Sequence, residues 1–67
     1  MVLKITGDFI KLGQALKASR LVDYGSDAKI VVQNGEVSVN GEVDLRRGRK
    51  LVRGDVVSYN GETLEII

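Results

Sequence analysis

Two Asn-Gly pairs, at residues 40–41 and 60–61, constrain the fold of this chain more than any other feature. Asn and Gly both tolerate the positive φ that a two-residue type I′ turn requires, so Asn-Gly between alternating segments is a strong hairpin signal. Apolar and polar residues alternate around the first pair, over residues 37–43, and the second pair precedes the apolar stretch 63–67. The second half of the chain is therefore predicted to form two antiparallel hairpins.

The apolar pattern in the first half has a helical period instead. Residues recur at steps of three and four on one side of a helix over about 11–20, and again over about 26–34. Ser26 or Asp27 can cap the second helix at its N-terminus, and Gly35 suits the left-handed conformation that often follows a helix. Two consecutive helices are predicted to precede the hairpins.

These elements predict an α+β fold. A short strand within residues 1–9 comes first, the two helices follow, and a small, mostly antiparallel sheet is built from the two hairpins. With 67 residues, 43% of them hydrophobic, the chain is expected to be a single globular domain over residues 1–67. Its core should be aliphatic, because the sequence has one Phe, two Tyr and no Trp.

Several classes of function are disfavoured by missing residues. The chain has no His and no Cys, which removes the usual general base, the thiolate nucleophile and the common zinc ligands. It also lacks the glycine-rich strings that bind nucleotide phosphates. We therefore expect a protein that is not an enzyme and uses neither a metal nor a cofactor. No apolar run approaches the length of a membrane span, so we expect no membrane partner and a cytoplasmic location.

The basic segment, residues 44–55 with the sequence DLRRGRKLVRGD, concentrates positive charge in a chain whose net charge is only +1. Five of the ten basic residues lie between positions 46 and 53, and four of these five are arginines. Planar guanidinium groups bind phosphate oxygens with two hydrogen bonds and can stack on bases, whereas solubility alone would be served equally by Lys or Glu. The segment is interpreted as a nucleic-acid-binding loop, and the simpler alternative is a solvated connection.

Four short motifs around this segment cover about residues 10–58. They are Lys11-Leu12-x-x-x-Leu16, Gly25-Ser26-Asp27-Ala28-Lys29, Gly35-Glu36-Val37-x-Val39-Asn40-Gly41 and Gly54-Asp55-Val56-Val57. In this order they resemble the S4 domain, an RNA-binding module named after a small-subunit ribosomal protein. With Arg47-Gly48-Arg49-Lys50 before the last motif, the chain is most similar to the small stand-alone bacterial members of that family.

The resemblance implies the alpha-L motif, in which two helices pack on a small sheet and RNA lies against the helices and a neighbouring basic loop. Lys11 matches the family's basic contact at the start of the first helix, and Lys29 matches the lysine of the stand-alone members. Many larger members have a basic residue entering the second helix, where this chain has Asp27, so the contacts are expected to shift to Lys29 and the loop.

The predicted function is non-catalytic binding of structured RNA, ribosomal RNA above all or transfer RNA, in ribosome assembly or translation, by a monomer. The predicted RNA-binding residues are Lys11, Lys29, Arg46, Arg47, Arg49, Lys50 and Arg53. Lys17 and Arg20, on the outer side of the first helix, are interpreted as solvent-facing. The alternative is a protein interaction module that uses the arginine loop or the C-terminal strand 63–67 as a sheet edge.

Overall fold

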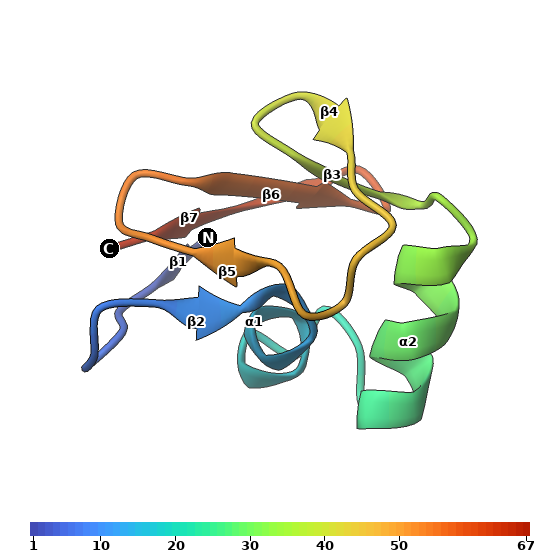
Figure 1. Ribbon diagram of the computed structural model, residues 1–67, viewed down its shortest axis with the longest axis horizontal. Helices are drawn as coiled ribbons and strands as arrows, with labels where there is room; N and C mark the ends of the chain where they lie inside the picture. The colour runs from blue at the N-terminus through green and yellow to red at the C-terminus, as the bar shows by residue number, and fades with distance from the viewer.

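The computed structural model describes the whole chain, residues 1–67, and its main sheet has five strands in the order β1-β7-β6-β3-β4 (Figure 1). The strands are β1 (Val2–Leu3), β3 (Val37–Val39), β4 (Glu42–Val43), β6 (Val56–Tyr59) and β7 (Glu62–Ile66). Only β1 and β7 pair in parallel, so the sheet is mostly antiparallel as predicted.

The two Asn-Gly pairs form the hairpin turns that the sequence predicts. Asn40 and Gly41 have φ of 52° and 86°, and Asn60 and Gly61 have φ of 52° and 79°. Positive φ at both central residues is the type I′ geometry, whose twist matches that of the flanking strands. The first turn joins β3 to β4 and the second joins β6 to β7.

The C-terminal strand β7 is not a sheet edge, so this part of the alternative prediction is wrong. It pairs with β6 on one side and with β1 on the other. The N-terminal ammonium group and the Met1 carbonyl also hydrogen bond to Thr63 and Glu65 in this strand. The N-terminal residues thus pair with the side of β7 that the local sequence pattern predicts to be a free edge.

A second, two-stranded sheet was not predicted. Strand β2 (Ile10–Lys11) pairs antiparallel with β5 (Lys50–Leu51) beside helix α1, so the basic segment enters a strand before it ends (Figure 1). Strands of two residues are too short to produce a period-two signal. In this two-stranded ribbon the side chain of Leu51 is buried in the core, and the side chains of Lys11 and Lys50 are exposed.

The helices are α1 (Leu12–Ala18), which is shorter than the predicted range 11–20, and α2 (Gly25–Gln33), which is shifted by one residue from the predicted range 26–34. Helix α1 ends where Arg20 takes a left-handed φ of 62°. The predicted cap on α2 is wrong, because the helix begins at Gly25 after an extended Tyr24 whose side chain makes no capping bond. Its end agrees with the prediction, since Gly35 has a φ of 76°.

The hydrophobic core lies between the main sheet and the two helices, and all of its members are aliphatic. The buried residues are Ile5, Leu12, Ala15, Leu16, Val22, Ala28, Val31, Val32, Val37, Val39, Leu51, Val57, Leu64 and Ile66. They include the apolar residues that recur at helical spacing in the sequence, Leu12, Ala15 and Leu16 in α1 and Ala28, Val31 and Val32 in α2. Neither helix has the length and apolar character needed to cross a membrane.

Candidate nucleic-acid interface

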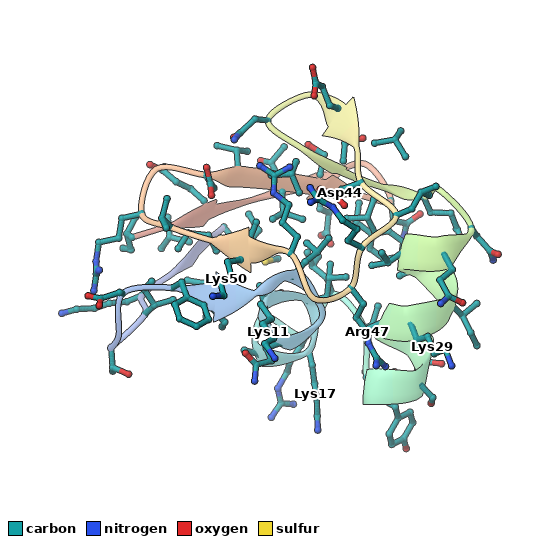
Figure 2. All side chains as sticks on the ribbon, in the orientation of Figure 1. Lys11, Lys17, Lys29, Asp44, Arg47 and Lys50 are labelled. Carbon is teal, nitrogen blue, oxygen red and sulfur yellow. The ribbon has the colours of Figure 1, made fainter.

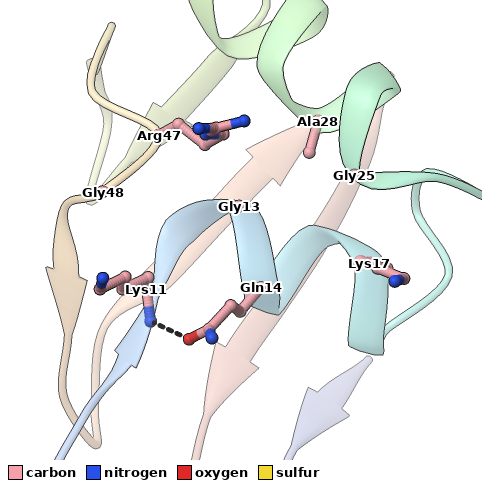
Figure 3. A pocket seen from close by; sticks show the side chains of 8 residues that line it. All are labelled: Lys11, Gly13, Gln14, Lys17, Gly25, Ala28, Arg47 and Gly48. Atoms are coloured by element: carbon pink, nitrogen blue, oxygen red, sulfur yellow. Dashed lines mark hydrogen bonds between the residues drawn. The ribbon is translucent and has the colours of Figure 1, made fainter.

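A cleft of about 300 Å³ opens between α1, the first turn of α2 and the loop that joins β4 to β5 (Figure 3). Its lining residues are Lys11, Gly13, Gln14, Lys17, Gly25, Ala28, Arg47 and Gly48. Three of these eight residues are cationic and none is acidic. The cleft therefore has the electrostatic character of an anion-binding site.

Backbone hydrogen bonds attach the loop to the start of α1. The first N–H groups of a helix have no partner within the helix. Here the N–H of Leu12 donates to the carbonyl of Arg49 at 2.8 Å, and the N–H of Gly13 donates to the carbonyl of Arg47 at 2.9 Å. The N–H of Lys11 donates to Oε1 of Gln14 at 3.2 Å (Figure 3). The loop and the start of α1 are thus one hydrogen-bonded unit.

Gly13 allows the side chain of Arg47 to cross α1. A Cβ atom at position 13 would lie 2.5 Å from Cγ and 3.1 Å from Cδ of Arg47. Figure 3 shows the Arg47 side chain passing from the loop towards α2, above Gly13. Only glycine leaves room for this path, so residue 13 determines where the guanidinium group lies.

The loop is also organised around one buried carboxylate. Asp44 is 5% exposed, and its oxygens accept hydrogen bonds from the N–H, Nε and Nη2 of Arg46 and from Nη1 of Arg49, at 2.9 to 3.1 Å. The hydrogen bonds from Arg46, reinforced by Arg49, hold the pKa of Asp44 far below its usual range although burial opposes this shift. Arg46 and Arg49 thus have an internal partner, which the composition of the segment does not predict.

A family model described as the S4 domain matches residues 3–67. The chain belongs to the S4 domain family. A similar protein is the probable ribosome maturation protein RlbA of Bacillus subtilis (strain 168), 46% identical over 88% of this chain and 83% of that protein. The putative RNA-binding protein YbcJ of Escherichia coli (strain K12) is 33% identical over 87% of this chain and 83% of that protein.

Solved structures share the fold of this S4 domain. The solution structure of YbcJ from E. coli, described as containing an alpha-L motif involved in RNA binding, aligns with a TM-score of 0.76 at 28% identity, over 98% of this chain and 85% of that one. The ribosomal protein S4e of Thermoplasma acidophilum aligns with a TM-score of 0.73 at 24% identity, over 87% of this chain and 31% of that one. The predicted α+β fold with an alpha-L motif is confirmed.

The seven predicted RNA-binding residues of this S4 domain do not lie together. Lys11 and Arg47 line the cleft, and Lys50 lies opposite Lys11 in the β2–β5 ribbon (Figure 2). Arg46 is 72% and Arg49 is 30% exposed, and both are paired with Asp44. Asp44 therefore holds both side chains in place, although that of Arg46 remains largely exposed.

The remaining two predicted residues lie outside the cleft. Lys29 is exposed on α2 but does not line the cleft (Figure 2). Arg53 donates from Nη2 to the carbonyl of Ile5 at 3.0 Å, which ties the turn before β6 to the N-terminal segment. RNA contact at either residue stays a prediction.

Lys17 lines the cleft but was interpreted as an ordinary solvent-facing residue. It lies three residues after Gln14 and four after Gly13, so it is on the same face of α1 as both. Helical spacing from Lys11 and Gln14 could have indicated this face. No local pattern indicates that the basic loop packs beside Lys17.

Proposed function

We propose that this S4 domain binds structured RNA, with the cationic side chains of Lys11, Lys17 and Arg47 holding backbone phosphates in the cleft. The observation that carries the proposal is the convergence of these three cations in one cleft with no carboxylate facing them. Guanidinium and ammonium groups are the usual ligands of RNA phosphates. The proposed role is binding, without catalysis.

The shape of the cleft also supports contact with a nucleic-acid backbone. Gly25 and Gly48 leave parts of its wall without side chains, so a phosphodiester chain can approach the protein backbone closely there. A-form RNA presents its phosphates and 2′-hydroxyl groups to such a surface and hides its base edges in a narrow major groove. We infer recognition mainly by shape and charge.

The setting that we propose is ribosomal RNA during ribosome assembly or translation, with transfer RNA as the other candidate. The support is the similarity to RlbA, whose name describes ribosome maturation, and to YbcJ, whose name describes RNA binding. We propose that the domain acts in the cytoplasm as a monomer.

A charge-reversal pair tests the cleft. Lys17→Glu with Arg47→Glu reverses two charges in the cleft, and we expect affinity for a stem–loop fragment of ribosomal RNA to fall more than about tenfold in low salt, because two phosphate contacts are lost. The matched control is Lys4→Glu with Arg20→Glu, which makes the same change in net charge at exposed positions outside the cleft.

The control should bind within about twofold to threefold of wild type, because neither Lys4 nor Arg20 lines the cleft and contacts a phosphate held there. Both double variants should unfold at the wild-type temperature. Equal losses in the two variants would mean that RNA responds to net charge alone, and the cleft would not be the binding site.

A further inference from the structure

The outer face of the β2–β5 ribbon has an electrostatic feature that folding alone does not explain. Lys11 and Lys50 lie directly opposite each other in the antiparallel register, and both are exposed. Like charges in directly opposite positions destabilise a strand pair. The two ion pairs of the molecule both involve Asp44, so neither lysine is neutralised by a carboxylate.

The only phenylalanine of the chain lies on this face. Phe9 is 44% exposed, and Nζ of Lys50 lies 4.8 Å from the centroid of its ring. Phe9 precedes Lys11 by two residues, and the pleat of an extended chain places such residues on the same side. The core is aliphatic and Phe9 is not among the residues packed against it. An exposed aromatic ring thus lies beside the ammonium group of Lys50 on this face.

This face continues from the cleft. Lys11 lines the cleft with Arg47 and is at the same time the cross-strand partner of Lys50 (Figure 2). A phosphate held by Lys11 would therefore have its neighbouring nucleotide over the ribbon, beside the ring of Phe9. The cleft itself offers no aromatic side chain, because its lining residues are cationic, polar or small.

We propose that Phe9 is a stacking platform for one unpaired base, and that Lys11 and Lys50 hold the phosphates on either side of that nucleotide. Aromatic faces stack on bases of any sequence, and unpaired nucleotides are the ones whose bases are free to do so. The contact of Lys50 with the ring is weak at an exposed site, so its ammonium group can move to a phosphate. This inference rests on the proposed function and refines the ligand to a stem with an unpaired nucleotide beside it.

Two RNA hairpins with the same stem and loop test the platform, one fully paired in the stem and one with a single bulged adenosine. Wild type should prefer the bulged hairpin. Phe9→Leu keeps an apolar side chain but removes the aromatic face, and it should weaken binding of the bulged hairpin by about fivefold or more while leaving the paired hairpin within about twofold. Phe9→Tyr should keep the preference. Ile30→Ala, an exposed apolar position on α2 outside the cleft, is the control.

A spectroscopic signal gives an independent readout. The chain has no tryptophan, so Phe9→Trp introduces a single selective fluorophore. Its fluorescence should be quenched by the bulged hairpin and much less by the paired one. Each of the following results would overturn the stacking platform and leave the cleft proposal intact: equal affinity of wild type for both hairpins, an equal loss of affinity for both hairpins with Phe9→Leu, or equal quenching by both hairpins. If the cleft were not the binding site, the Lys17→Glu, Arg47→Glu double variant would bind RNA with wild-type affinity.

Discussion

Asp44 is the residue on which the conformation of the basic segment depends. It is a buried carboxylate in a loop of exposed neighbours, and two arginines of the same segment enclose it. A buried charge is tolerated only where it is paired and hydrogen bonded. All hydrogen-bond partners of its carboxylate come from within five residues along the chain, so the conformation of the segment is organised around this side chain.

Asp44→Asn keeps the shape of this side chain and removes its charge. We expect the free energy of unfolding at neutral pH to fall by about 2 kcal/mol, because hydrogen bonds to charged groups contribute about 1.5 to 3 kcal/mol. The folded state depresses the pKa of Asp44, so its ionised form stabilises the fold above the unfolded value of about 4, and this stability is lost as the pH falls below that value.

Urea titrations of both proteins at several pH values measure this effect. The stability difference between wild type and Asp44→Asn should shrink as the pH falls from about 5 to about 2. Asp55, whose pKa is also lowered, chiefly by a hydrogen bond from the Val52 N–H, is present in both proteins and cancels in the difference. A difference that stays constant over this range would show that the charge of Asp44 contributes nothing.

Gly13 determines the path of the Arg47 side chain because it has no side chain of its own. Gly13→Ala would bring a methyl group against Cγ of Arg47 and force the arginine side chain out of its position. The free-energy cost should be about that of a strained rotamer. We expect RNA affinity to fall by about twofold to tenfold. Helix α1 should remain intact, because Ala is a better helix former than Gly.

A double-mutant cycle isolates this contact. In an Arg47→Ala background the atoms that meet the new methyl group are absent, so Gly13→Ala should have no further effect on RNA binding. If Gly13→Ala weakens binding equally in both backgrounds, its effect comes from the helix or from direct contact with RNA, and not from the position of Arg47.

At the scale of elements, the loop between β4 and β5 has two structural roles. The side chains of Arg46 and Arg49 hold Asp44, whereas the carbonyls of Arg47 and Arg49 accept hydrogen bonds from the start of α1. The side chain of Arg47 is left for the cleft. The concentration of arginine in the sequence is thus partly structural, although the composition of the segment suggests a single purpose.

Elements with local signals could be predicted from the sequence. The two Asn-Gly turns need particular φ values, which Asn and Gly adopt. The apolar spacing of each helix indicates which face is buried. Each of these elements is therefore specified by residues close together in the sequence. The β2–β5 ribbon could not be predicted, because its strands are two residues long and pair across about 40 positions. The same long-range packing brings Arg47 over Gly13 and Lys17 into the cleft.

At the scale of the whole molecule, the field that attracts RNA comes from the arrangement of charge, since the net charge is only +1. The cleft and the outer face of the β2–β5 ribbon lie on the side occupied by α1 and β2, away from the main sheet (Figure 2). On that side Lys11, Lys17, Arg47 and Lys50 are free of carboxylate partners. The central claim is that these cations, and not the arginines around Asp44, neutralise phosphates.

The salt dependence of RNA binding tests this claim most directly. Three or four phosphate contacts predict a slope of log affinity against log salt of about −2 to −4 for wild type with an RNA stem–loop. Arg47→Gln should make the slope less steep by about 0.7 to 0.9, whereas Arg46→Gln, whose side chain is held by Asp44, should leave it unchanged. A slope near zero for wild type, or a change for Arg46→Gln as large as for Arg47→Gln, would contradict the account.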